Sequence, residues 1–275
     1  MTSGVRSLRT RQPPPRRQTA SQLGAIFETD PRDRRGWFED GTMTTIEMTH
    51  ERARTAAQLV RTRSRVRQIL LLCGILSPLL YVATDVLGGM RYEGYSFSSQ
   101  AISELMAIGA PSETFVDPLF ITYGVLTLAF GVGVFREGLD GNRALRIAGL
   151  LLIAYAASGL TGPVFFEMHQ RGAGGGSGSD FPHIVLTGVL VGLTLLAIGS
   201  SAFALGKRFR AYCFGALTTL IVFGVLSAPY GARLAAGQPT PGFGIVERIL
   251  IYSSLLWIAV FAIALLRRPF RPLSS

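Results

Sequence analysis

The sequence is poor in cysteine and histidine, with two cysteines and three histidines among 275 residues. Cys73 and Cys213 each follow an arginine-rich segment by a few residues, inside a long apolar stretch. We therefore expect them to be packing residues on the reducing side of a membrane rather than a disulfide. The first 40 residues also lack an apolar core longer than Leu23–Phe27. No secretory signal peptide is expected, and the first apolar stretch is expected to act as an uncleaved anchor.

Charged residues are missing from the middles of six apolar stretches, which indicates a membrane protein. Each stretch holds about 17 to 22 residues, enough at about 1.5 Å per residue to cross a hydrocarbon core about 30 Å thick. The stretches lack the alternation of apolar and polar residues that barrel strands show. The expected fold class is all-α, a polytopic membrane bundle of six transmembrane helices. The spans are predicted at Ile69–Leu87, Leu119–Phe135, Ile147–Phe166, Ile184–Leu205, Tyr212–Ala228 and Ile249–Leu266.

Basic residues crowd every second connection between these spans, and this alternation predicts the orientation. They are Arg136, Arg143, Arg146, Lys207, Arg208, Arg210, Arg267, Arg268 and Arg271. The other connections contain only Arg91, Arg171 and Arg233, with Arg248 at the following helix start. By the positive-inside rule, the N and C termini are predicted to be cytoplasmic. The connections after spans one, three and five are predicted to face outward.

The same partition accounts for the net charge of +10 without a nucleic-acid partner. The predicted cytoplasmic regions sum to +14 and the outward regions to −4. A nucleic-acid-binding function needs a folded basic module, and the sequence shows none. The predicted partner is the lipid bilayer, because basic side chains next to a span attract anionic lipid heads by about 1 kcal/mol each. The arginines expected to do so are Arg61, Arg63, Arg65 and Arg67.

Composition divides the chain into four parts. Residues 1–45 are rich in arginine and proline, and we expect them to be disordered because they are too polar to bury a core. Residues 46–67 are predicted to form a basic juxtamembrane helix. Residues 68–268 form the expected six-helix domain, and residues 269–275 form a cytoplasmic tail.

The first outward connection, residues 95–111, is expected to contain a short amphipathic helix. Ser96 and Ser98 are residues that cap a helix start, Gly109 suits a left-handed stop position, and Pro111 prevents continuation. At helical spacing the residues fall on two faces. The apolar face contains Phe97, Ala101, Leu105 and Ile108, and the polar face contains Gln100, Ser103, Glu104 and Ala107.

This connection also carries a family resemblance. The segments Tyr95–Ser96, Ser103–Leu105 and Gly109–Pro111, after a first span with Ser77–Pro78, resemble the six-helix prokaryotic membrane family catalogued as domain of unknown function 998. The resemblance covers roughly residues 67–268. It implies the six-helix architecture and a prokaryotic plasma membrane, and it supplies no activity, since none is established for the family.

The resemblance further implies an outer aspartate and a histidine at the start of span four. Asp180 and His183 occupy these places, although the glycine-rich segment Gly172–Gly178 ahead of them is less typical of the family.

Three functions compete for the predicted outer face. A metal-dependent hydrolase is one, although a catalytic zinc usually takes three protein ligands, often histidines, and this side offers two histidines. The candidate catalytic residues are Ser103, Glu104, Asp180 and His183, and the candidate metal ligands are Glu167, His169, Asp180 and His183. A transporter is the second, although the spans lack midplane charges.

The favoured function is a structural, interaction or lipid-contacting role, without a cofactor. Under it, the polar outer face binds a partner or a lipid head. Glu247 is expected near the outer end of its span, where Arg91 or Arg233 is a potential ion-pair partner. Gly188 and Gly192 are expected to let a neighbouring helix of the same bundle approach closely, and a dimer face is the alternative.

Overall fold

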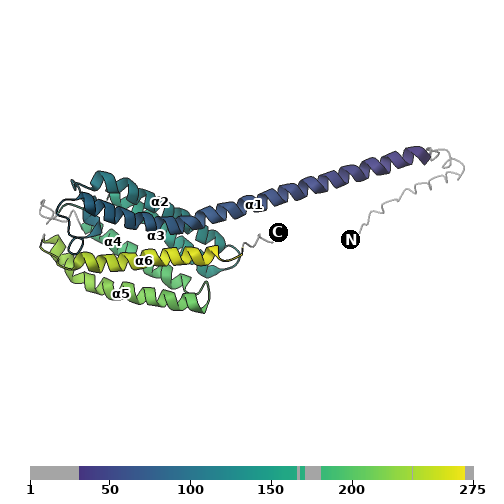
Figure 1. Cartoon of the computed structure of the whole chain (residues 1–275). Coiled ribbons are helices and arrows are strands. Elements are labelled where there is room, and N and C mark those ends of the chain that lie inside the picture. Colours follow the sequence, from purple (N-terminus) through teal and green to yellow (C-terminus); the bar gives the residue numbers. More distant parts are fainter. Residues whose placement is uncertain (1–30, 166–167, 171–180, 237, 270–275) are drawn as a thin grey trace, which may run out of the picture. The chain divides into compact units, whose positions relative to one another are not determined.

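A computed structural model of the chain describes residues 31–165, 168–170, 181–236 and 238–269. The regular elements of the described residues are helices, apart from one isolated β-bridge between Ile108 and His169 (Figure 1). Six of these helices are long and apolar enough to span a membrane. The elements are α1 (Pro31–Arg91), the 3₁₀ helix η1 (Ile102–Met106), α2 (Glu113–Glu137), α3 (Arg143–Phe165), α4 (Phe181–Ser201), α5 (Lys207–Ala235) and α6 (Phe243–Leu266). The predicted all-α, six-span fold is thus confirmed.

The chain divides into two compact units, residues 1–59 and 60–275. In the first unit the described residues belong to α1, so residues 31–45 of the segment expected to be disordered are helical, whereas residues 1–30 lie outside the described residues. The second unit contains the rest of α1 and every other element. In it α2 packs on α3, α3 on α4, α4 on α5 and α5 on α6.

Turn residues fix the ends of the helices, and the predicted span four was too long. That helix ends at Ser201 rather than Leu205, because residues 202–204 turn and Gly206 adopts a φ of 100° before α5. Between α2 and α3, Gly141 has a φ of 97° and Asn142 accepts a hydrogen bond from the Leu145 amide at 3.2 Å. Glycine tolerates a positive φ and asparagine caps a helix start, so both connections are tight.

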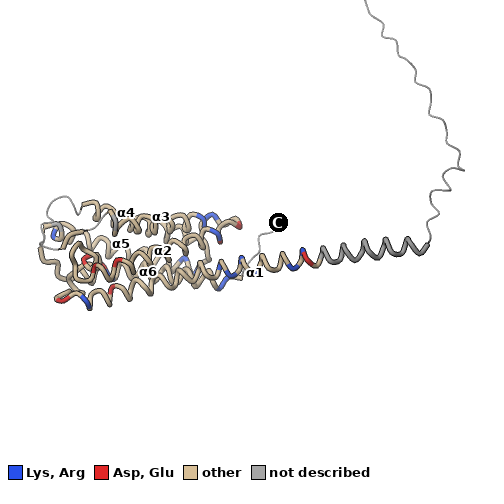
Figure 2. The backbone as a smooth tube through the Cα atoms, turned by 90° about the horizontal axis from the view of Figure 1, so that it is seen from above, with Lys and Arg blue, Asp and Glu red and all other residues tan. Residues whose placement is uncertain are grey.

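Charge separates along the second unit (Figure 2). Most of its basic residues lie in the helix ends that flank the α2–α3 and α4–α5 connections, at the start of this unit's part of α1 and directly after α6, and we call this the basic end. The opposite end carries residues 92–112 between α1 and α2, and we call it the loop end. Figure 2 shows most of the acidic residues of this unit near the loop end. The segregation agrees with the alternation in the sequence.

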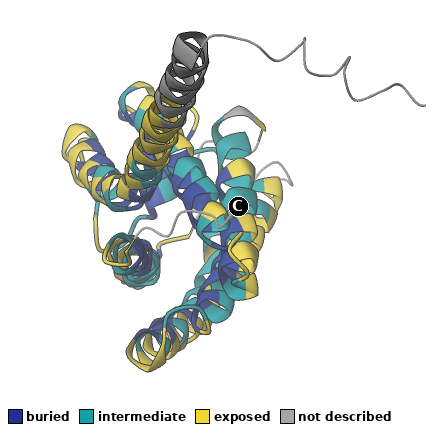
Figure 3. Cartoon of the chain, turned by 90° about the vertical axis from the view of Figure 1, so that its right-hand side faces the viewer, coloured by how far each residue is buried: buried dark blue, intermediate teal, exposed yellow. Residues whose placement is uncertain are grey.

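The half of the bundle next to the basic end holds the continuous hydrophobic core. Phe130, Trp257 and Phe261 are fully buried there, with Phe261 edge-on to Phe130 and stacked with Trp257 at centroid distances of 5.9 and 5.4 Å. Figure 3 shows the buried positions of the helices turned toward one another and the exposed positions turned outward. Aromatic packing of this kind fixes helix spacing in the absence of a hydrophobic driving force between helices in lipid.

One arginine joins three helices at the basic end. Arg67 of α1 binds the carboxylate of Glu137 with both a 2.6 Å and a 3.1 Å hydrogen bond and donates to the Leu265 carbonyl of α6 at 2.8 Å. Arg67 is one of the four arginines expected at anionic lipid. The other three, Arg61, Arg63 and Arg65, are exposed.

Glycine allows close helix packing, but not at the glycines that the sequence suggested. A Cβ atom at Gly149 of α3 would lie 2.4 Å from the backbone nitrogen of Phe135 in α2, and one at Gly74 would lie 2.5 Å from the Phe130 ring. Cβ atoms at Gly188 and Gly192 would meet nothing within 4 Å. The expected packing of Gly188 and Gly192 inside the bundle is therefore wrong, because their face of α4 is open.

Candidate functional site

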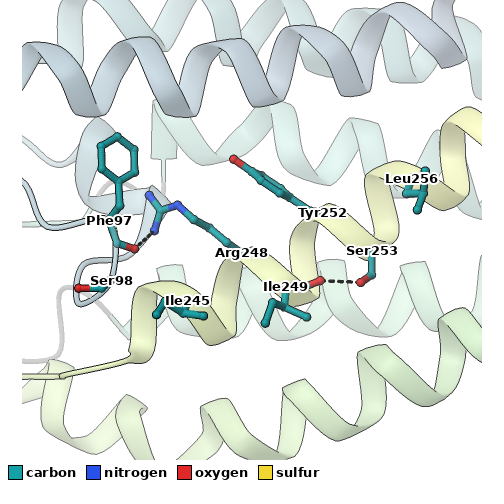
Figure 4. Close-up of a pocket in the computed structure, with 8 residues that line it drawn as sticks. All are labelled: Phe97, Ser98, Ile245, Arg248, Ile249, Tyr252, Ser253 and Leu256. Atoms are coloured by element: carbon teal, nitrogen blue, oxygen red, sulfur yellow. Dashed lines mark hydrogen bonds between the residues drawn. The ribbon is translucent and has the colours of Figure 1, made fainter.

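The loop end is organised around a buried ion pair between α1 and α6. Arg248 of α6 binds Asp85 of α1 with its Nε and Nη2 atoms at 3.0 and 2.8 Å, and the Asp85 side chain is fully buried. Tyr252, one turn further along α6, donates to the same carboxylate at 2.6 Å. Figure 4 shows Arg248 and Tyr252 projecting from α6. A planar guanidinium matches a carboxylate in two parallel hydrogen bonds, so this pair joins the two helices firmly.

Arg248 also holds the connection at residues 92–112. Its Nη1 atom donates to the Phe97 carbonyl at 2.8 Å (Figure 4). The same atom donates to the carbonyls of Gln100 and Gly244, each at 3.1 Å, and the Nη2 atom donates to the Tyr95 hydroxyl at 2.8 Å. One side chain therefore ties the connection to α6 at three points.

Tyr95 links Arg248 to the backbone just before η1. Its hydroxyl donates to the Ala101 carbonyl at 2.7 Å, and burial raises the pKa of the Tyr95 phenol above its ordinary value. The phenol therefore stays protonated and keeps donating at physiological pH. It fixes the entry into η1.

Two carboxylates hold η1 in place. Glu104 accepts a hydrogen bond from the Ala101 amide at 2.7 Å, and Glu247 of α6 accepts one from the Ile102 amide at 2.7 Å. At the far end of η1, Ser112 donates to the Leu105 carbonyl at 2.6 Å. The amides at the start of a helix lack intrahelical partners, and carboxylates satisfy them well.

This element differs from the short amphipathic helix expected within residues 95–111. It is a five-residue 3₁₀ helix, and it is buried in the bundle: Leu105 is fully buried and Glu104 is 2% exposed. Gly109 does take the expected left-handed conformation, with a φ of 78°. The carbonyls of the preceding turn bind Arg248 instead of continuing a helix, which explains its short length.

A cavity of about 290 Å³ lies beneath η1. All six long helices contribute to its lining, which reaches from Ser103 and Met106 of η1 to Thr194 of α4 and Leu220 of α5, near the middle of the helices. Its volume is close to the lower limit of about 300 Å³ for small-molecule sites. The loop-end half of the bundle thus holds this cavity, whereas the hydrophobic core lies in the basic-end half.

The cavity is mainly apolar, with a small set of polar groups. Tyr123 and Tyr155 join α2 to α3 through a 3.0 Å hydrogen bond between their hydroxyls, and Tyr81 of α1 packs edge-on against Tyr123 at 4.9 Å. The lining also includes Ser103 of η1, His183 of α4 and Glu247 of α6. An apolar volume with few convergent polar groups is the usual form of a ligand site.

Two other hollows are more open. One, of about 550 Å³, lies along the face of α6 that contains Ile245 and Leu256, both more than half exposed (Figure 4). The other, of about 530 Å³, lies at the basic end beside Arg63 and Arg136. The first is a groove on an apolar helix face, where lipid chains pack in a membrane. The second is lined mainly by charged and polar residues. The cavity beneath η1 is the candidate site because its lining is mainly apolar, reaches the middle of the helices and includes a few polar groups, which is the usual form of a ligand site.

The residues predicted from the sequence separate into three groups. Ser103 and His183 both line the cavity. Glu104 is buried in the hydrogen-bonded turn, and His169 pairs through its backbone with Ile108. Glu167 and Asp180 lie outside the described residues.

The metal-dependent hydrolase therefore stays a prediction. No group of three His, Cys, Asp or Glu side chains suited to a metal occurs among the residues described, a set that leaves out two of the four candidate ligands. Metal analysis of the purified protein and of a His183→Ala variant tests it directly.

The sequence did not reveal the role of Glu247 or the tyrosines. The expected pairing of Glu247 with Arg91 or Arg233 is wrong for the described contacts, because Glu247 accepts the Ile102 amide and Arg91 lies over the Phe115 ring at 3.5 Å. For Glu247 the sequence did carry one signal, a carboxylate in the first turns of a span. A charged group costs free energy in that position, so its presence there points to a function.

Comparison with known proteins gives a family and no activity. No curated protein and no solved structure matches the chain. The family described as a protein of unknown function, DUF998, matches residues 75–264, from within α1 to within α6. These residues hold the ion pair, η1 and the cavity lining. The chain belongs to this family.

Proposed function

We propose that this protein is a lipid-contacting membrane protein that binds a small apolar or amphipathic molecule in the cavity beneath η1. The observation that carries the proposal is the cavity itself, about 290 Å³ in volume and lined by all six long helices. An unfilled apolar volume of this size costs packing energy, so a bundle that needed only structural stability gains nothing from it. The mainly apolar lining favours an alkyl chain over an ion.

The orientation proposed for this function places the loop end outside a prokaryotic plasma membrane, with both termini in the cytoplasm. The gathering of basic residues at the opposite end supports it (Figure 2). Anionic lipid heads then contact the exposed Arg61, Arg63 and Arg65 at the cytoplasmic surface, whereas Arg67 binds Glu137.

A cavity-filling substitution tests the proposal. Gly159 of α3 lines the cavity, and a Cβ atom there would lie 3.9 Å from Leu190, so a larger side chain enters the empty volume. We expect Gly159→Leu to reduce several-fold the labelling of α3 and α4 peptides by a neutral alkyl photoprobe in nanodiscs. Mass spectrometry of the digested protein measures the labelling.

Gly188→Leu is the matched control. It makes the same change in an apolar helix, at a position where a Cβ atom meets nothing within 4 Å and which does not line the cavity. We expect its labelling to equal that of the wild type. Equal labelling of Gly159→Leu and the wild type would overturn the proposal.

A further inference from the structure

Glu247 is a carboxylate within a membrane-spanning helix that lines an apolar cavity. Its hydrogen bond to the described part of the chain joins Oε2 to the Ile102 amide at 2.7 Å. No lysine or arginine occurs among the described residues that line the cavity.

The adjacent arginine forms no ion pair with Glu247, because its hydrogen bonds go to other groups. Arg248 forms two hydrogen bonds with Asp85, and its remaining hydrogen bonds go to Tyr95 and to backbone carbonyls of the loop end and of α6. Asp85 and Arg248 therefore balance each other in charge. Glu247 is left with a backbone donor and with the cavity.

A positive partner stabilises the ionised form of a carboxylate in such a position. An isolated ionised group is expensive to bury, and ionisable residues within membrane spans usually mark a substrate or ion pathway. An N–H···O bond between an ammonium and a carboxylate is about twice as strong as a neutral hydrogen bond. A ligand that brings a protonated amine supplies this partner, and its apolar part suits the rest of the lining.

We propose that the ligand of the cavity is a single-chain amphiphile whose protonated amine binds the Glu247 carboxylate. The chain then lies against the α3 and α4 lining toward Tyr123 and Tyr155. The volume of about 290 Å³ selects one alkyl chain rather than the two chains of a phospholipid. This inference rests on the proposed function and adds the chemical class of the ligand.

Two alkyl photoprobes that differ only in the head group test it. The wild type and Glu247→Gln, each in nanodiscs, are labelled with a diazirine derivative of decylamine or of decanol, and labelled peptides are quantified by mass spectrometry. A glutamine still accepts the Ile102 amide, so the fold of η1 is retained. We expect Glu247→Gln to lower amine labelling of the α3 and α4 peptides about tenfold, as loss of a charge-assisted hydrogen bond predicts. Alcohol labelling stays unchanged.

Each outcome has a defined meaning. If the alcohol probe labels the cavity and the amine probe labels the wild type and Glu247→Gln equally, the amine inference is overturned and the proposed function stands. Absence of cavity labelling by both probes in the wild type overturns both. Glu247→Asp, which keeps the charge, should restore part of the amine labelling. Glu113→Gln is the control, since Glu113 is a carboxylate that accepts the Gly109 amide at 2.6 Å and does not line the cavity.

Discussion

Three carboxylates near the loop end show how neighbours with the same chemistry acquire different roles. Asp85 is matched by a guanidinium, Glu104 by backbone and side-chain amides within its own turn, and Glu247 by one amide and the cavity. The differences arise from which element approaches each carboxylate. A buried carboxylate with a complete partner set stabilises the fold, whereas one that borders an empty volume is available to a ligand.

Asp85→Asn should destabilise the protein by about 3 to 5 kcal/mol, because removal of one partner leaves the Arg248 charge buried without compensation. Unfolding in a denaturing detergent series, followed by circular dichroism, measures the change. Glu93→Gln, at an exposed residue of the connection at residues 92–112, should change stability by less than about 0.5 kcal/mol. Equal stability of the two variants would show that the Asp85–Arg248 pair contributes nothing.

At the scale of elements, the connection at residues 92–112 owes its fixed position to one side chain of α6. Arg248→Lys keeps the charge next to Asp85 but cannot reach the carbonyls of Phe97, Gln100 and Gly244 together. We expect backbone amides of this connection to exchange with deuterium at least about tenfold faster, since local opening loses several hydrogen bonds at about 1 kcal/mol each. Exchange in α2 should not change, and protection of the connection at the wild-type level would contradict this role of Arg248.

Helix packing gives a second prediction at this scale. Gly149→Ala should destabilise the protein by about 1 to 3 kcal/mol, because the new Cβ atom meets the α2 backbone, which cannot move aside as a side chain can. Gly188→Ala makes the same change where space is open and should be neutral or slightly stabilising. Parallel detergent unfolding of the two variants measures the difference, and equal stabilities would place the α2–α3 contact elsewhere.

These elements also show what the sequence can and cannot predict. The spans follow from local composition, and Gly109 was identified as a left-handed stop because only glycine adopts that conformation at no cost. The partner of Arg248 lies 163 residues away, and the expected amphipathic helix became a 3₁₀ helix because its carbonyls bind that arginine. Gly188 and Gly149 look alike in sequence, and only the arrangement of the helices distinguishes them. Long-range pairing and cavities are therefore the part that the sequence could not predict.

For the molecule as a whole, the two halves of the bundle differ in how their interiors are filled. The half at the basic end has a continuous core and the Arg67–Glu137 ion pair, whereas the half at the loop end has a cavity beneath η1. A packed half provides a rigid base on which the open half keeps its shape. Any ligand therefore enters from the loop end or from the bilayer. The orientation of the protein decides on which side of the membrane the loop end lies.

Cysteine labelling in intact cells tests this orientation. Ser98 of the loop end and Asp140 of the α2–α3 connection are both exposed, and Cys73 and Cys213 are first replaced by alanine. We expect Ser98→Cys to react with a membrane-impermeant maleimide from outside, and Asp140→Cys to react only after permeabilisation, because the basic end is predicted to be cytoplasmic. The reverse pattern would place the cavity toward the cytoplasm. Reaction of both cysteines from the same side would show that α2, the one long helix between them, does not cross the membrane, and would overturn the six-span topology itself.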